Sequence, residues 1–199
     1  MLIFGHAGLT LGAALLLAGS GMGSHSSQNG EVTPGVESTD HSKTPKALRI
    51  ESLAHYVDLR LLLVGSLLPD LIDKPIGELF LRGTFNNGRI FGHTLIFLAI
   101  ITTIGFYQYR HNRKTWLLTF SFGTFTHIVF DQMWRNPHTL LWPAYGLSFP
   151  KVEVINWTKL LVSPQAYLPE LAGAAILIWF AQLLARKRSI FAFLRYGKV

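Results

Sequence analysis

The sequence predicts an all-α, polytopic helical membrane protein, a single integral membrane domain over residues 1–199. Hydrophobic residues make up 49% of the chain and charged residues only 15%, whereas a soluble domain usually has about 25% charged residues. The apolar residues also gather into separate runs, and their lengths suggest about five membrane-associated helices. We therefore expect a multi-pass protein of the cell membrane, with membrane lipid as a partner.

The basic residues support a membrane topology over nucleic-acid binding. The formal net charge is +7, but the positive charges cluster in Arg110–Lys114 and after Arg186, each directly behind an apolar run. Cytoplasmic loops of membrane proteins have this pattern, so no nucleic-acid partner is expected. The chain has no cysteine. Any metal site must therefore use His, Asp or Glu side chains.

The first apolar run, residues 2–20, has the length of a membrane-spanning helix and includes His6. A signal peptide is the alternative, because Ala18–Ser20 is rich in small residues. No basic region precedes the run, so we favour a retained helix. Residues 21–48, which contain Gly, Ser, Thr and Pro but few large apolar residues, predict a flexible loop.

Residues 49–69 predict a second helix, amphipathic at first and then apolar. We expect this helix to end at Pro69, and Pro75 to block its continuation, because proline lacks the N–H that a helix needs. A short interfacial helix is predicted over 76–81.

The second half of the sequence predicts three more passes. They cover residues 91–109, with His93 in the first helical turn, 115–133 and 168–185. Between the last two lies 134–166, an irregular interfacial segment rich in proline and tryptophan. The basic tail, 186–199, carries aromatic residues and is expected on the membrane surface.

The topology places a set of ionisable residues at one membrane level. The loop Arg110–Lys114 and the tail after Arg186 are both assigned to the cytoplasm, and the two passes between them are consistent with this. Ionisable residues within membrane segments are costly and usually have a functional reason. Counting outward from these loops puts six of them at the opposite level: His6, Asp70, Asp73, His93, His127 and Asp131.

These residue types suit a metal ion. His127 and Asp131, four residues apart, share one helix face, and imidazoles with carboxylates suit Zn²⁺, Mn²⁺ or Mg²⁺. Such an ion lowers the pKa of a bound water and generates hydroxide near neutral pH. Simpler interpretations remain open: His93 as a packing residue, His127 and Asp131 as a helix-end pair, and Asp70 as a helix-end carboxylate. Convergence at one level favours the metal site.

Four blocks, Leu67–Pro75, Arg89–Thr94, Thr126–Asp131 and Leu140–Pro143, follow an opening Gly-His at His6. Their order resembles that of the predicted membrane-bound metal-dependent hydrolases (YdjM-like), over most of residues 1–146. The chain departs from this pattern at Gly88, where many members have histidine, and by one extra residue between the two acids. The resemblance implies an integral membrane protein and a presumed hydrolase, with matching positions at His6, Asp70, Asp73, His93, His127 and Asp131.

The favoured hypothesis is an enzyme that hydrolyses an ester or phosphoester, including a lipid-like one, with a metal-activated water at the membrane boundary. A non-catalytic scaffold with a structural His/Asp network is the alternative, as is a small ion- or proton-coupled transporter. Transport is disfavoured because the polar groups lie at helix ends. The expected metal ligands are Asp70, His93, His127 and Asp131. Asp73 or His6 is expected to complete the ligand shell or to act as general base, and Arg89 is expected to bind an anionic group.

Overall fold

The computed structural model describes residues 3–21, 57–151 and 164–197, and every regular element in these ranges is helical. The predicted all-α class is therefore confirmed for the described residues. The predicted loop over 21–48, except residue 21, and residues 152–163 of the interfacial segment lie outside them. The elements are α1 (Ile3–Gly21), α3 (Leu59–Lys74), the π-helix η1 (Pro75–Phe80), α4 (Leu95–Asn112), α5 (Trp116–Phe130), the 3-10 helix η2 (Met133–Arg135), α6 (Pro137–Leu140), α8 (Pro164–Arg186) and α9 (Ile190–Tyr196).

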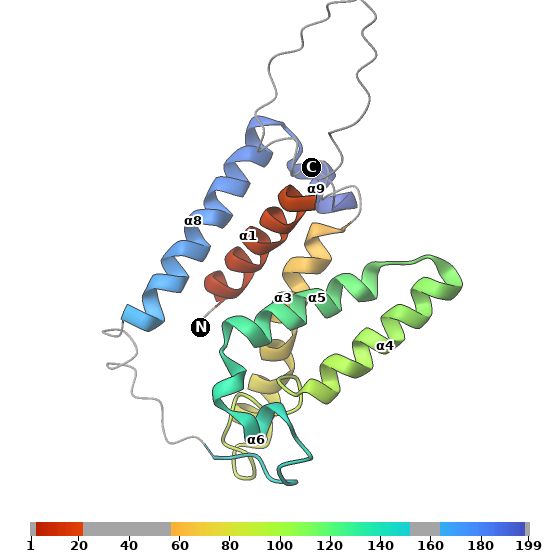
Figure 1. Cartoon of the computed structure of the whole chain (residues 1–199). Coiled ribbons are helices and arrows are strands. Elements are labelled where there is room, and N and C mark those ends of the chain that lie inside the picture. Colours follow the sequence, from red (N-terminus) through yellow and green to blue (C-terminus); the bar gives the residue numbers. More distant parts are fainter. Residues whose placement is uncertain (1–2, 22–56, 152–163, 198–199) are drawn as a thin grey trace, which may run out of the picture.

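Helices α1 and α8 run side by side in the same direction, and α3 returns beside α1 in the opposite direction (Figure 1). Helices α4 and α5 form a hairpin, and α5 crosses α3. This path brings together the start of α1, the end of α3, the start of α4 and the end of α5. The predicted site residues come from these four helix ends.

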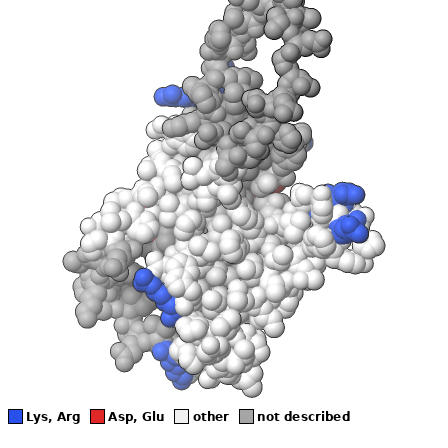
Figure 2. Space-filling view, in the orientation of Figure 1, with Lys and Arg blue, Asp and Glu red and all other residues white. Residues whose placement is uncertain are grey.

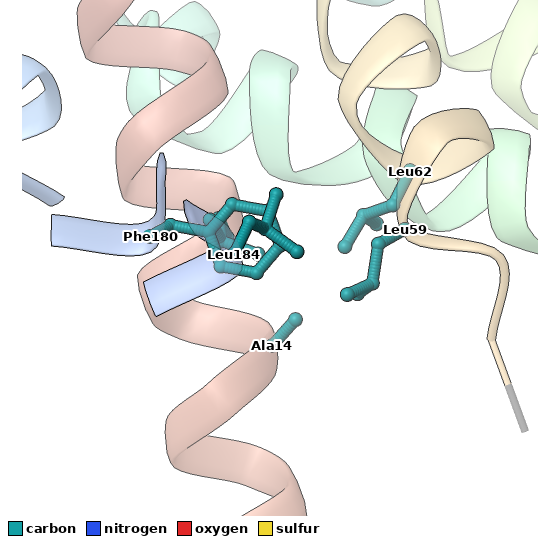
Figure 3. Close-up of a cluster of buried hydrophobic side chains, with 6 residues drawn as sticks. Ala14, Leu59, Leu62, Phe180 and Leu184 are labelled. Atoms are coloured by element: carbon teal, nitrogen blue, oxygen red, sulfur yellow. The ribbon is translucent and has the colours of Figure 1, made fainter. Parts of the chain in front are cut away.

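A buried apolar cluster joins α1, α3 and α8 at the other end of these helices (Figure 3). Beside it, α9 packs through Phe193 against Phe180, with ring centroids 5.4 Å apart. The Arg60 guanidinium, at the start of α3, donates to the carbonyl of Leu194 at 2.9 Å. The cluster comprises Leu11, Ala14, Leu59, Leu62, Phe180 and Leu184.

Glycine allows α1 and α8 to touch backbone to backbone. A Cβ added at Gly8 would collide with the carbonyl oxygen of Gly173. Small residues support such close helix contacts in membranes, where apolar burial gives little drive for helices to associate.

Replacing Gly8 with alanine is expected to destabilise the fold by about 1–3 kcal/mol, because backbone atoms on both sides of the contact must separate. Thermal unfolding in detergent measures this loss. Gly83→Ala is the matched control, since an added Cβ there meets nothing within 4 Å. Equal unfolding temperatures for the two variants would contradict the proposed close contact.

Helix α3 does not end at Pro69, so that prediction is wrong. The helix continues through Pro69 to Lys74 and passes directly into η1 at Pro75. Proline at position 69 cannot donate to the carbonyl of Gly65, but the Thr124 hydroxyl of α5 donates to that oxygen at 3.3 Å. Pro75 stands first in η1, where proline is well tolerated.

Helix α4 begins later than predicted. Thr94 is its N-cap, because its hydroxyl accepts from the N–H of Phe97 at 3.1 Å. His93 therefore lies in the turn before the helix and not in its first turn, which corrects the prediction. From this turn the His93 ring contacts both Asp73 and His127.

Length and composition show one helix able to cross a membrane in the described part of the chain, Tyr167–Arg186. Two shorter apolar helices cover Ile3–Leu17 and Trp116–Phe130. The five predicted passes are therefore not confirmed. The surface is nevertheless largely free of charged side chains on the face that Figure 2 shows, and large apolar residues such as Ile104 and Ile178 are exposed.

Candidate metal centre

The structure brings the six predicted site residues to one place. Each of four helix ends contributes at least one of them, and all three histidines of the set are fully buried. The start of α1 supplies His6, the last turns of α3 supply Asp70 and Asp73, the turn before α4 supplies His93, and the end of α5 supplies His127 and Asp131.

Two buried imidazoles face each other at the middle of the cluster. The Nε2 atoms of His93 and His127 are 3.1 Å apart. The Nδ1 of His127 lies 2.6 Å from the carbonyl oxygen of Ser66, and the Nδ1 of His93 lies 2.7 Å from Asp73 Oδ2. These oxygens accept hydrogen bonds, so each Nδ1 carries the proton, and in the neutral rings each Nε2 presents a lone pair.

Two lone pairs that face each other at this distance repel unless a metal cation lies beside them or one of the two Nε2 atoms carries a proton. Asp70 adds an oxygen to the same place, with Oδ1 at 3.6 Å from His93 Nε2 and 3.9 Å from His127 Nε2. One ligand atom from each of these three residues lies within 4.8 Å of the others. The three side chains therefore fit a metal ion.

A second group shares His127. The His6 ring stacks on the His127 ring with centroids 3.9 Å apart, and His6 Nε2 lies 3.4 Å from Asp131 Oδ1. Within the described residues, Nδ1 of His6 has no hydrogen-bond partner, and Nε2 has only this 3.4 Å contact with Asp131. An unsatisfied buried polar group costs about 1–3 kcal/mol, and coordination of a cation would remove this cost.

Asp73 lies behind His93 and not beside the facing nitrogens. Its Oδ1 accepts from the N–H of Gly92 at 2.8 Å, and its Oδ2 accepts from the N–H of Ile90 at 2.7 Å as well as from His93. This fully buried carboxylate thus fixes the orientation of the His93 ring. Carboxylates commonly hold metal-binding histidines in this way.

The turn that carries Arg89 and His93 is anchored on both sides. Asn87 accepts from the N–H of Arg89 at 2.9 Å and donates to the carbonyl of Pro150 at 2.7 Å. The ring of Phe91 packs edge-on against Trp142 and other aromatic side chains. These contacts place Arg89 so that its Nε donates to Asp131 Oδ2 at 2.5 Å.

Three residues at the site were missed from the sequence. Lys74 donates to Asp70 Oδ2 at 2.7 Å, and its position four residues later on the same helix could have signalled it. Glu170 of α8 accepts from the N–H of Gly5 at 3.0 Å. An acidic residue inside an apolar run indicates a functional site, so the sequence could have suggested it. The carbonyl of Ser66 left no signal in the sequence.

A family model described as YdjM inner membrane protein matches residues 1–194. The comparisons with curated proteins and with solved structures returned no match.

Proposed function

Since this chain belongs to the YdjM inner membrane protein family, a family of the cell's inner membrane, we propose that it is a multi-pass, metal-dependent hydrolase of esters or phosphoesters. One observation carries the proposal: the Nε2 atoms of the buried His93 and His127 are 3.1 Å apart, and carboxylates of Asp70 and Asp131 lie beside them. The alternative of a scaffold with a structural His/Asp network is separated from it by the experiment below.

Each proposed ligand residue contributes one nitrogen or oxygen atom, and all of them lie around the Nε2 atoms of His93 and His127. Three imidazoles with two carboxylates favour Zn²⁺ or Mn²⁺ over Mg²⁺, which prefers oxygen ligands. In this assignment His6 completes the ligand set, because its buried Nδ1 has no partner within the described residues. The full proposed set is His6, Asp70, His93, His127 and Asp131.

The chain's own groups prepare the site for hydrolysis. A divalent cation supplies Lewis acidity and lowers the pKa of a bound water. Asp73 holds the proton on Nδ1 of His93, and the Ser66 carbonyl does so for His127. Both contacts keep Nε2 available and raise ring basicity. In the net reaction water adds across the ester bond, the bond to the leaving alcohol breaks, and an acid and an alcohol result.

The site is proposed to lie at the membrane boundary. If α1, α3, α4 and α5 cross the membrane together with α8, the helix ends that form the site all lie on one side. Helix α5, with 15 residues, is about 22 Å long, shorter than the roughly 30 Å hydrocarbon core. Helix α5 alone is therefore too short to span the core, and we propose that its site end lies just below the lipid headgroups, where a lipid-like substrate can reach it.

Metal content tests the site directly. We expect the protein purified in detergent to hold Zn²⁺ or Mn²⁺ stoichiometrically, and His127→Ala to lose it, when both are measured by elemental analysis. His111→Ala is the matched control, because His111 is an exposed residue in the last turn of α4. Equal metal content in wild type and His127→Ala would contradict the site.

Activity then separates the enzyme from the scaffold. A panel of carboxylic esters and phosphoesters is assayed with the metal-loaded protein and with His127→Ala. Hydrolysis that depends on His127 supports the proposed enzyme. Metal binding without turnover of any ester would favour a structural metal in a membrane scaffold.

A further inference from the structure

We infer that Lys74 and Arg89 form a phosphate-binding pair beside the metal centre, so that the substrate carries a phosphoryl group. This inference rests on the proposed function and narrows its substrate class from esters in general to phosphoesters. The observation behind it is that each of the two acidic ligands, Asp70 and Asp131, forms an ion pair with a cation.

Each of these two carboxylates accepts from a cation through its Oδ2. Asp70 directs Oδ1 toward His93 and His127, and its Oδ2 accepts from Lys74. Asp131 directs Oδ1 toward His6, and its Oδ2, which lies 3.8 Å from His93 Nε2, accepts from Arg89. The two cations thus occupy equivalent positions on separate elements.

Burial places both cations on the outer side of the cluster. The side chains of Asp70 and Asp131 are 12% and 2% exposed, whereas those of Lys74 and Arg89 are 41% and 42% exposed. A molecule that approaches the buried nitrogens from outside therefore meets these two cations.

Both cations keep hydrogen-bond donors for a ligand. The Arg89 guanidinium uses its Nε for Asp131, and within the described residues Nη1 and Nη2 make no hydrogen bond. The Lys74 ammonium has three N–H donors and uses one for Asp70. A guanidinium with two outward amino groups binds the oxygens of a phosphate in a forked geometry.

The two exposed cations favour an anionic substrate. With neutral histidines, Asp70, Asp73 and Asp131 carry three negative charges, and Lys74 and Arg89 carry two positive charges. A bound divalent cation would change the net charge of these five groups from −1 to +1, and Glu78 near Lys74 adds one negative charge, which brings the total to 0. A neutral ester gains little from the two exposed cations, whereas a phosphoryl group offers several anionic oxygens that accept charge-assisted hydrogen bonds from ammonium and guanidinium groups.

The negative charge of Glu78 opposes the positive charge of Lys74. Its removal should therefore change phosphate affinity in the direction opposite to removal of Lys74. Glu78 lies beside Gly88, and a Cβ added at Gly88 would be 3.2 Å from Glu78 Cδ and 3.3 Å from Lys74 Cγ. Its carboxylate therefore lies near Lys74 and should weaken an anion held there. Removing this charge should strengthen phosphate binding.

The experiment measures the binding of inorganic phosphate to the metal-loaded protein in detergent by titration calorimetry. We expect Lys74→Gln and Arg89→Gln each to weaken binding about tenfold, because each removes charge-assisted hydrogen bonds, and Glu78→Gln to strengthen it. Arg110→Gln, at the far end of α4, is the control and should bind as wild type. Arg89→Lys keeps the charge and should recover part of the loss.

Metal content is measured in every variant, which separates the two proposals. A wild type without metal would contradict the proposed function. A wild type and variants that hold metal but bind phosphate equally would overturn the phosphate-binding pair and leave the metal centre intact. If Arg89→Gln loses its metal, phosphate binding by Lys74→Gln decides between these outcomes.

Two further probes identify the source of the phosphoryl group. Glycerol 3-phosphate and a short-chain phosphatidic acid are titrated in the same way, with diacylglycerol as the neutral comparison. Binding of phosphatidic acid more tightly than glycerol 3-phosphate would indicate a lipid substrate. Equal binding of these two ligands would indicate a soluble phosphoester. Binding of diacylglycerol as tight as that of phosphatidic acid would overturn the inference.

Discussion

Replacing Asp73 with asparagine is expected to lower metal affinity by about 10- to 100-fold, the usual effect of removing a carboxylate that holds a metal-binding histidine. Both oxygens of Asp73 accept hydrogen bonds: one from Gly92, the other from Ile90 and the His93 ring. Asparagine has one oxygen and one amino group, so a donor would face a donor at one of these positions. The His93 ring then loses its fixed orientation.

Metal titration of the Asp73→Asn protein measures this effect, and thermal unfolding in detergent measures the accompanying loss of stability. A buried donor without a partner costs about 1–3 kcal/mol, so some destabilisation is expected. Asp58→Asn is the control: Asp58 caps the opposite end of α3, where it accepts from the N–H of Arg60 at 3.0 Å. Unchanged metal affinity in Asp73→Asn would show that His93 needs no positioning carboxylate.

The convergence of the site residues was predicted from the sequence on the assumption of a multi-pass topology, in which every helix end lies at one of two membrane levels. Once Arg110–Lys114 and the tail after Arg186 were placed on one side, the other ends of the same passes had to share the opposite level. His6 and Asp131, distant in sequence, therefore could be grouped before any contact between them was known. The structure places them 3.4 Å apart.

The separate positions of Asp70 and Asp73 could not be predicted in this way. Three residues apart on one helix, both acids point toward the same region. The difference arises from the turn before α4, whose backbone N–H groups at Ile90 and Gly92 bind Asp73. A contact between distant backbone segments leaves no residue pattern, so the sequence left Asp73 open as ligand, base or supporting residue.

The continuation of α3 through Pro69 has a similar explanation. Proline was expected to end the helix because the carbonyl of Gly65 loses its donor. The replacement donor is the hydroxyl of Thr124, which reaches Gly65 from α5. The same crossing of α3 and α5 lets the Ser66 carbonyl hold His127. Helix packing, which the local sequence does not encode, therefore determines the geometry of the site.

Gly123→Ala is the strongest test of this dependence. A Cβ at Gly123 would lie 2.7 Å from the backbone carbon of Gly65 and from the backbone nitrogen of Ser66, so α5 must move away from α3. His127 lies one turn further along α5, and the shift should break its 2.6 Å contact with the Ser66 carbonyl. We expect a loss of stability of about 1–3 kcal/mol together with a loss of metal affinity.

Phe125→Ala separates these two effects. Phe125 lies on the same helix but its side chain is 49% exposed, so its removal leaves the crossing of α3 and α5 unchanged. Metal titration and thermal unfolding are measured for both variants. We expect Phe125→Ala to keep metal affinity at any stability it retains, and Gly123→Ala to lose affinity at temperatures where it is still folded. If Gly123→Ala bound metal as wild type does, the α3–α5 contact would support the fold without setting the position of His127.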